Sequence, residues 1–295
     1  MASETRSIEL PTATERAKSV ASSIRSSPRT FWGIVILSII TLSVIFGPTL
    51  TPYAPETTHP THILEGPSPQ FPLGTDHLGR DLLTRVLKGG QSSLALGFGS
   101  IVLSLIMGVP LGLVAGYLGG KWDEIIMRSM DVLMSIPTLL LGLLILAILT
   151  SNIYTVIFAI GVVYAPRFAR VVRSATLEVK NQEFIEAVEA QGEPTYYILF
   201  GEILPNIRGP ILVEGSIRFG FAILIGTSLS FLGLGTQPPA ADWGYMVSVG
   251  REHIYRSPWF ILWPSVILLI TVFSVNLIGD GLRDVFDTRV GGEEI

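Results

Sequence analysis

The sequence predicts an all-α integral membrane protein with six transmembrane helices, and two observations support this fold class. The first is composition: of 295 residues, 48% are hydrophobic and only 15% are charged, with a mean hydropathy of +0.54. Soluble domains carry about 25% charged residues, so this balance favours lipid as the solvent. The second is that apolar runs of roughly the 20 residues needed to cross a bilayer recur along the chain, at residues 31–50, 93–117, 132–149, 153–172, 211–234 and 259–279.

The first apolar run follows a polar tail at residues 1–30 and is predicted to be a retained membrane anchor. No small-residue cleavage pattern follows the run, where the sequence reads "GPTLTPYAP". A cleavable signal peptide would need such a pattern and a shorter polar start. We therefore expect the span at 31–50 to remain part of the protein.

Residues 51–92 are predicted to form an external loop with an amphipathic helical segment. In "FPLGTDHLGRDLLTRVLKGG", residues 71–90, charges of alternating sign occur at Asp76, Arg80, Asp81 and Arg85. Two interpretations have equal support from the residues. The segment is either a solvated stretch at the membrane surface or a docking site for an external partner.

The second span, 93–117, carries Gly108, Gly112 and Gly116 on one helical face, because they are four residues apart. Small residues let another helix backbone approach closely, so helix packing is favoured here over a pore-lining role. Only "LTSN" at 149–152 separates the third and fourth spans. A tight turn is expected there, since the joined run is too long for one span.

Lys and Arg in the connecting loops predict that both termini are cytoplasmic. Cytoplasmic loops carry an excess of these residues. With the N-terminus inside, fourteen of them lie on the inner side and only five lie on the outer side, namely Arg80, Arg85, Lys88, Arg251 and Arg256. The chain is therefore predicted to be a multi-pass protein of the cell membrane. Its tails, 1–30 and 281–295, and its loop at 174–209 face the cytoplasm.

The loop at 174–209 contains a polar stretch, "EFIEAVEAQGEPTYYILFGEILPN", at residues 183–206. Its first helix has an acidic flank that includes Glu186, and Gly192 is placed to end that helix. Pro194 then opens a second helix, which Pro205 ends. Helices that lie on membranes normally carry Lys and Arg on the polar side, so the acidic flank favours docking to another protein.

Charged and polar groups within the spans are scarce. Glu214 and Arg218 lie four residues apart in the fifth span and can pair on one face. Ionisable residues inside a span suggest a transport pathway, so two interpretations remain open: a mutually satisfied pair, or part of the translocation pathway. Asp131 at the start of the third span and Asn276 in the sixth are weaker candidates for the same pathway.

The fifth span leads into "SLSFLGLGTQPPAADWGYMVSVGRE", residues 228–252. The Gly and Pro content of this stretch predicts a non-helical re-entrant loop, which is tolerated only where protein or water covers it. Trp243 and Tyr245 are candidate anchors at the outer membrane interface.

The sequence argues against several classes of function. It has no cysteine, so disulfides and thiolate chemistry are excluded. It has no G-x-x-x-x-G-K-[ST] phosphate loop, so the chain is not expected to hydrolyse nucleotide by itself. The net charge of −4 argues against nucleic acid as a partner. His59 and His62 are interpreted as bystanders in an extended loop. We therefore expect a non-catalytic chain that binds no metal or cofactor.

The stretch at 183–206 resembles the EAA loop of ABC importer permeases, the segment with which that family docks on cytoplasmic ATPase subunits. The family pattern E-A-A-x-x-x-G, then nine residues, then x-x-L-P, falls on Glu186, Ala187, Val188, Gly192, Leu204 and Pro205. Val188 replaces the usual second Ala, and Glu202 stands where the family often has an apolar residue or His. The resemblance implies that the other five matching residues couple this chain to ATPase subunits.

Further stretches narrow the resemblance to the C-type permease of dipeptide, oligopeptide and nickel transporters. They are "PLGTDHLGRDLLTRVLKGGQSSLALG", "GYLGGKWDEIIMRSMDVLMSIPTLLL", "SLSFLGLGTQPPAADWGYM" and "DGLRDVFDTR", and the likeness covers almost all of residues 31–289. One departure is Gly226, near the place where members often carry an acidic residue. A pore-lining role is therefore not transferred to that position.

The resemblance implies a type I ABC importer permease fold and a defined assembly. The chain would pair with a second, homologous permease subunit, two cytoplasmic ATPase subunits that bind ATP and Mg²⁺, and an external substrate-binding protein. The expected substrate is a dipeptide or oligopeptide, with nickel, glutathione or an oligosaccharide as alternatives. A secondary transporter is the alternative outside the family, and it should show inverted repeats or more buried charges.

Overall fold

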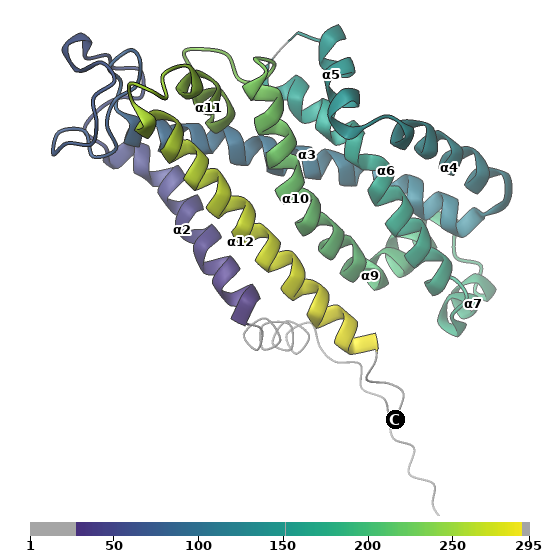
Figure 1. Cartoon of the computed structure of the whole chain (residues 1–295). Coiled ribbons are helices and arrows are strands. Elements are labelled where there is room, and N and C mark those ends of the chain that lie inside the picture. Colours follow the sequence, from purple (N-terminus) through teal and green to yellow (C-terminus); the bar gives the residue numbers. More distant parts are fainter. Residues whose placement is uncertain (1–27, 151, 291–295) are drawn as a thin grey trace, which may run out of the picture.

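The computed structural model describes residues 28–150 and 152–290, which form helices and connecting loops (Figure 1). The helices are α2 (Pro28–Leu50), α3 (Leu82–Leu118), α4 (Gly120–Ser135), α5 (Thr138–Ile148), α6 (Ile153–Val179), α7 (Glu183–Ala190), α8 (Thr195–Tyr197), α9 (Leu204–Asn206), α10 (Arg208–Phe231), α11 (Trp243–Glu252) and α12 (Pro258–Val290). A 3₁₀ turn, η1 (Pro60–His62), and a π-helical turn, η2 (Ile198–Ile203), are also present. The predicted tails at 1–27 and 291–295 lie outside the described residues.

Five of the described helices, α2, α3, α6, α10 and α12, are long and apolar enough to cross a membrane. A sixth crossing exists only if α4 and α5 together form one broken span, because these two helices meet at 91°. The prediction of one continuous helix at 132–149 is therefore wrong. The break falls at Ile136, whose backbone is extended, since the ring of a following proline such as Pro137 disfavours helical geometry at the preceding residue.

Two helices extend beyond their predicted limits. α3 begins at Leu82 and not at residue 93, so the segment at 71–90 is helical only in its second half. The Asp81 side chain starts this helix by accepting a 2.8 Å hydrogen bond from the backbone N–H of Thr84. α12 continues to Val290, so residues 281–290, predicted as a tail, are helical.

The glycine face of α3 packs against α6, as predicted. A Cβ atom at Gly108 would lie 2.5 Å from the carbonyl oxygen of Ala165, and one at Gly112 would lie 2.5 Å from that of Ala169. A Cβ at Gly116 would lie 2.7 Å from Cβ of Thr176 and 2.9 Å from the carbonyl oxygen of Arg173. The two helix backbones therefore touch directly along three turns, and α3 and α6 have the most extensive contact of any described helix pair.

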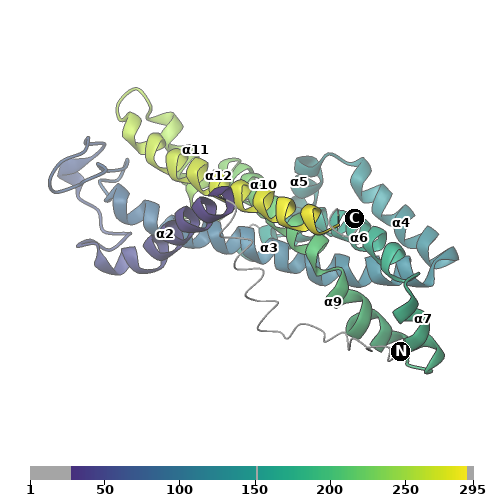
Figure 2. The same cartoon turned by 90° about the horizontal axis from the view of Figure 1, so that it is seen from below.

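The other long helices surround this pair. α10 contacts both α3 and α6, α12 contacts α10, and α2 lies along α12 (Figures 1 and 2). An apolar cluster joins α3, α5, α6 and α10, and its buried members include Leu96, Leu146, Ile160, Phe168 and Leu229. This core fixes the positions of the helices that carry the candidate sites.

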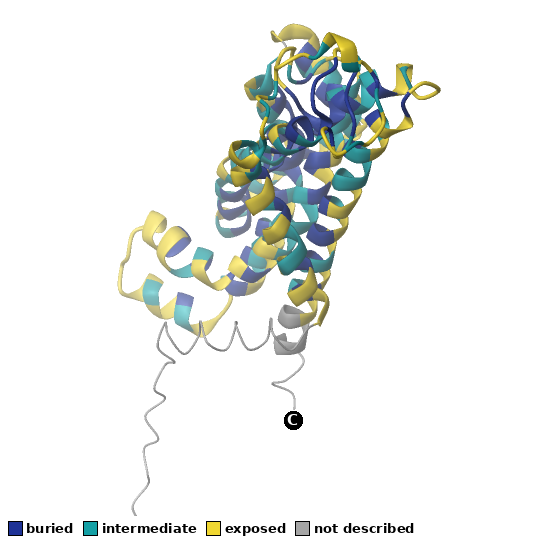
Figure 3. Ribbon diagram, turned by 90° about the vertical axis from the view of Figure 1, so that its left-hand side faces the viewer, coloured by how far each residue is buried: buried dark blue, intermediate teal, exposed yellow. Residues whose placement is uncertain are grey.

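Residues 51–81 and α11 form a cap over one end of α3. Figure 3 views the molecule from the side of this loop and shows dark blue, buried backbone inside a yellow rim. Trp243 is fully buried there, and its Nε1 donates a 2.8 Å hydrogen bond to the carbonyl oxygen of Val86. The predicted non-helical loop over 228–252 is limited to residues 232–242, and the prediction of Trp243 as an interface anchor is wrong. The Asp242 side chain caps and starts α11 instead.

Candidate coupling surface and translocation residues

α7 and the helical run α8–η2–α9 form a hairpin beside the end of α3 and α6 (Figures 1 and 2). Its inner face belongs to an apolar cluster with residues of both long helices. The buried members of this cluster are Val109, Leu113, Val172, Val179, Ile185, Ile198, Leu199, Ile203 and Ile207. Burial of Ile185 and Ile203, which are fully covered, fixes both arms of the hairpin to the bundle.

One hydrogen bond ties the hairpin to the end of α3, and a second joins α3 to the residue that caps α6. The hydroxyl of Tyr117 donates to Oε1 of Glu189 over 2.7 Å. Nζ of Lys180, directly after α6, donates to the carbonyl oxygen of Gly116 over 3.1 Å. A displacement of α7 therefore reaches α3 directly, and not only through the short connection from α6.

Gly192 forms the turn of the hairpin, as predicted. Its φ of +78° lies in the left-handed region that favours glycine, and its N–H donates to the carbonyl oxygen of Glu189. No atom lies within 4 Å of a Cβ built at this position. The turn therefore projects into open space, where another molecule can approach it.

The second arm runs from Thr195 to Asn206, one residue beyond the predicted end at Pro205. The Tyr197 hydroxyl hydrogen-bonds to the Glu202 carboxylate, and this raises the pKa of Tyr197. Three aromatic side chains of this arm point outward: Tyr196, Tyr197 and Phe200 are 70%, 43% and 50% exposed. The predicted coupling residues Glu186, Ala187, Gly192 and Pro205 are also exposed, and Leu204 is half-buried against the apolar cluster.

The outer side of the hairpin thus combines acidic and aromatic groups, and we call it the coupling surface, defined by Glu186, Ala187, Gly192, Glu193, Tyr196, Tyr197 and Phe200. The sequence reasoning did not distinguish the outward aromatic residues from the inward aliphatic ones. Ordinary helical spacing would place residue 203 beside residue 196, and the two sets separate only because residues 198–203 form the π-helical turn η2.

The structure brings together two of the four predicted translocation residues, Glu214 and Arg218. Nε of Arg218 lies 2.5 Å from Oε1 of Glu214, so the predicted pair on α10 exists. Asn276 of α12 lies beside Gly220 of α10, with its Oδ1 3.1 Å from a Cβ built there. Asp131 lies apart on α4, where it pairs with Arg170 of α6.

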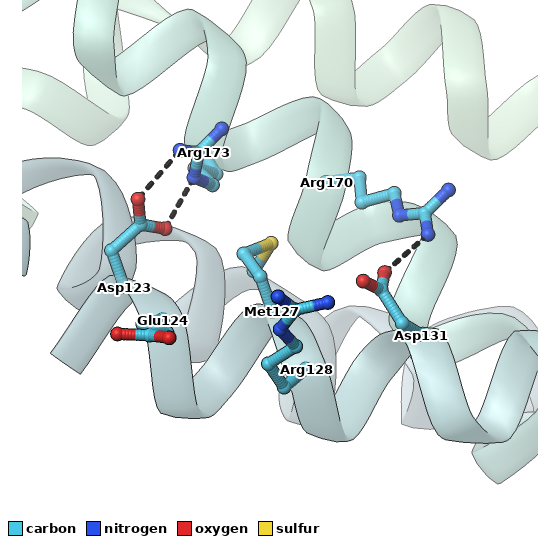
Figure 4. Close-up of a pocket in the computed structure, with 7 residues that line it drawn as sticks. All are labelled: Asp123, Glu124, Met127, Arg128, Asp131, Arg170 and Arg173. Carbon is cyan, nitrogen blue, oxygen red and sulfur yellow. Dashed lines mark hydrogen bonds and ion pairs between the residues drawn. The ribbon is translucent and has the colours of Figure 1, made fainter. Parts of the chain in front are cut away.

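A pocket of about 370 Å³ lies between α4 and α6 (Figure 4). Its lining residues are Asp123, Glu124, Met127, Arg128, Asp131, Arg170 and Arg173. Two ion pairs cross it, one between Asp131 and Arg170 and one between Asp123 and Arg173. The second pair was missed because its partners are 50 residues apart and no local pattern joins them.

The four predicted external docking residues are buried in the cap. Asp76 is fully covered, and Arg80, Asp81 and Arg85 are at most 6% exposed. Oδ2 of Asp76 lies 2.6 Å from Nε of Arg80 and 3.4 Å from Nε of Arg85. The expected amphipathic helix is wrong at this place, because Asp76 to Arg80 form a tight turn before α3. These side chains hold the cap together and are not an exposed docking surface.

Comparison with known protein families identifies the family of this chain. Residues 108–292 match the family described as "Binding-protein-dependent transport system inner membrane component". This match covers well over half of the chain and includes the coupling surface and the pocket. The chain belongs to this family. Residues 18–67 also match the N-terminal transmembrane domain of oligopeptide transport permease C.

Curated members of the transport family resemble the chain over most of its length. The dipeptide transport system permease protein DppC of Alkalihalophilus pseudofirmus is 41% identical, over 88% of this chain and 85% of the relative. The oligopeptide transport system permease protein OppC of Bacillus subtilis is 37% identical, over 90% and 87%. The glutathione transport system permease protein GsiD of Pectobacterium atrosepticum is 39% identical, over 91% and 93%.

A solved structure confirms the predicted permease fold. A chain of the inward-facing MetNI methionine ABC transporter matches with a TM-score of 0.56, over 68% of this chain and 95% of that one. The sequence identity is 21%, so this likeness supports the fold alone. The chain is thus a multi-pass inner membrane component of a transport system.

Proposed function

We propose that this chain is the non-catalytic permease subunit of an ATP-driven importer of dipeptides or oligopeptides. One observation carries the proposal: an exposed acidic and aromatic hairpin is fixed by a buried apolar cluster to the two most closely packed helices, α3 and α6. Such a surface fits a protein partner, because aromatic side chains are enriched where proteins bind one another. A partner that moves the hairpin must also move the helices of the pathway.

The partners follow from the family and from what the sequence lacks. The chain carries no phosphate loop, so we propose that two cytoplasmic ATPase subunits bind ATP and Mg²⁺ and drive transport. A second, homologous permease subunit supplies the other half of the pathway, and an external binding protein delivers the substrate. Both termini and the coupling surface face the cytoplasm, in agreement with the distribution of Lys and Arg.

Coupling in this proposal is mechanical. When the ATPase subunits approach each other, they displace the hairpin at Gly192. The contacts of Ile185 and Ile203, with the Tyr117–Glu189 hydrogen bond, transmit the displacement to α3 and α6. Because Gly108 and Gly112 leave no gap between these helices, the pair moves as one unit. Glu214 and Arg218 lie on α10, which packs against this unit, so their surroundings change with it.

Peptides are the substrate class that the relatives favour. Relatives across 36–41% identity are named for dipeptide, di/tripeptide, D,D-dipeptide and oligopeptide transport. Glutathione is a second candidate, favoured by the 39% identical permease GsiD, and it is itself a peptide. The proposal therefore commits to short peptides and not to one sequence.

The test compares two glycines with the same geometry. Gly192 and Gly233 each follow a helix with φ near +80°, and each has open space around a Cβ. The importer is assembled in liposomes with Gly192→Trp or Gly233→Trp, and uptake, ATPase activity and co-purified ATPase subunits are measured. We expect Gly192→Trp to lose uptake while the permease still inserts. Gly233→Trp, which carries equal backbone strain at a site outside the hairpin, should keep its ATPase subunits.

A charge reversal gives a second arm that avoids backbone strain. Glu186→Lys changes an exposed side chain of the coupling surface, and Glu252→Lys changes an exposed side chain at the end of α11. We expect only Glu186→Lys to reduce the amount of ATPase subunits that co-purify with the permease. Normal uptake and normal co-purification in both Gly192→Trp and Glu186→Lys would refute the coupling surface.

A further inference from the structure

The pocket between α4 and α6 has the shape of a slot closed at each end by an ion pair. Figure 4 shows Asp123 with Arg173 at one end, Asp131 with Arg170 at the other, and Met127 between them. Nη2 of Arg173 lies 2.5 Å from Oδ2 of Asp123, and Nη2 of Arg170 lies 2.5 Å from Oδ1 of Asp131. The slot is thus built from two helices that are held together by charge.

The charges of the slot balance. Three carboxylates, from Asp123, Glu124 and Asp131, face three guanidinium groups, from Arg128, Arg170 and Arg173. A ligand of one sign would meet as much repulsion as attraction there, since the lining carries no net charge. A ligand with one positive and one negative end is complementary to it.

The ion pair at the Asp131 end is open to exchange. The side chains of Arg170 and Asp131 are 47% and 48% exposed, whereas those of Arg173 and Asp123 are 33% and 23% exposed. Pairs exposed to this extent contribute little to stability, so replacing one partner by a ligand group costs little. The guanidinium plane of Arg170 then binds a carboxylate with two parallel hydrogen bonds, which a flexible ammonium cannot offer.

We propose that this slot is a transient binding site for the charged ends of a transported peptide. The inference rests on the proposed function, and it names the place where this chain holds the substrate. Arg170 binds the α-carboxylate at one end of the slot, and the exposed Glu124, near the other end, receives the α-ammonium group. A volume of about 370 Å³ lies within the usual range of roughly 300–1,000 Å³ for small-molecule sites and accommodates a dipeptide.

Met127 explains how such a site serves peptides of different sequence. It lines the middle of the slot, between the two charged ends (Figure 4). Methionine is unbranched and polarizable, so its side chain adapts to apolar groups of different shape. Recognition therefore falls on the backbone ends, which all free peptides share, and not on their side chains.

α6 connects the slot to the coupling surface. α6 supplies Arg170 and Arg173 and continues to α7 after Val179 and a short turn. A displacement of the hairpin therefore shifts the wall of the slot that carries both arginines relative to α4. This shift separates the groups that hold the ligand, so the site releases the ligand during each transport cycle.

The experiment uses the complete transporter, with both permeases and both ATPases, in lipid nanodiscs without the binding protein. The probe is glycyl-photoleucine, a dipeptide with free ends and a diazirine side chain, and labelled residues are mapped by mass spectrometry. We expect labelling on α4 around Met127. Unlabelled glycyl-leucine should compete for the site, and its N-acetylated amide form should not.

Matched variants separate binding from folding. Arg170→Gln should weaken competition by glycyl-leucine at least about tenfold, because it removes both charge-assisted hydrogen bonds to the carboxylate. Arg170→Lys should lose less, because it keeps the charge. Arg208→Gln removes an exposed arginine outside the slot and should change nothing. Each variant is accepted only if its ATPase subunits co-purify.

Uptake of glycyl-leucine is measured on the same preparations with the binding protein added. Uptake without labelling of α4 would overturn the inference and leave the proposed function standing, as expected if side chains of the second permease fill the slot. Labelling that the blocked dipeptide competes for equally well would also overturn it. Absence of both uptake and labelling would overturn the peptide assignment itself, and the inference with it.

Discussion

The carbonyl oxygen of Ala169 in α6 lies 2.5 Å from the position that a Cβ atom would take at Gly112 in α3. The two backbones therefore meet with no side chain between them, and the coupling hairpin rests on the end of this pair. Backbone atoms cannot rotate aside as side chains can, so this contact is sensitive to the addition of a single methyl group.

We predict that Gly112→Ala destabilises the protein and that Gly142→Ala does not. Both glycines lie inside helices, where alanine is intrinsically favoured by about 1 kcal/mol. A Cβ at Gly142 would meet only Leu229 side-chain atoms, at an ordinary 3.5 Å. At Gly112 overpacking should cost about 1–3 kcal/mol. Melting temperatures of the two purified variants check this, and equal values would show that α3 and α6 can separate freely.

The buried charges of the cap give a second prediction. Asp76→Ala removes the carboxylate that pairs with the buried guanidinium groups of Arg80 and Arg85. Removing one partner of a buried ion pair typically costs about 3–5 kcal/mol of stability. Asp131→Ala removes a half-exposed partner and should cost at most about 1 kcal/mol. Limited proteolysis of residues 51–81 is the measurement. Rapid cleavage is expected for Asp76→Ala alone, and equal resistance in both variants would contradict the buried network.

Local spacing predicted the features that depend on neighbours in the sequence. The glycine face of α3, the turn at Gly192 and the Glu214–Arg218 pair all follow from residues two turns apart or closer. The break at Pro137 was also visible, since a proline inside an apolar run disfavours a continuous helix. The break was missed because the span was defined only by the length of its apolar run, and the residues on both sides of Pro137 in "SIPTLLL" are mostly apolar.

The features that sequence reasoning missed depend on distant contacts. Trp243 lies 157 residues from Val86, the acceptor of its hydrogen bond, so nothing near it in the sequence indicates burial. Asp76 and Arg80 were seen as surface charges for the same reason: charged residues are mostly exposed, and only the folded cap shows that these are enclosed. The slot between α4 and α6 likewise needs two helices placed side by side.

A third prediction concerns pH and Asp242, which caps α11. Burial raises the pKa of its carboxyl group, although that group accepts hydrogen bonds from the N–H of Gly244 (2.6 Å) and of Tyr245 (3.1 Å). Between the ordinary value of 3.8 and the raised value, the folded state holds a proton that the unfolded state has released. The contribution of Asp242 to stability therefore falls as the pH rises through this window.

Asp242→Asn should abolish that dependence, because asparagine keeps the capping oxygen and carries no charge. At pH 7 we expect the variant to melt at the same temperature as the wild type or higher. The difference between them should shrink as the pH falls through this window towards 3.8. Asp242→Ala is the control for the cap itself and should cost about 0.5–2 kcal/mol at both values. A difference that stays constant with pH would show that Asp242 remains charged throughout.

The last prediction separates the two interpretations of Glu214 and Arg218. Their side chains are only 13% and 18% exposed, so Glu214→Gln or Arg218→Gln alone leaves one charge in α10 without its partner. Each single change should destabilise the transporter by about 1–3 kcal/mol. The double variant removes both charges, and we predict that it regains most of the melting temperature and the uptake, since the pair acts as a unit. Recovered stability with uptake still abolished would instead assign these charges to the translocation pathway.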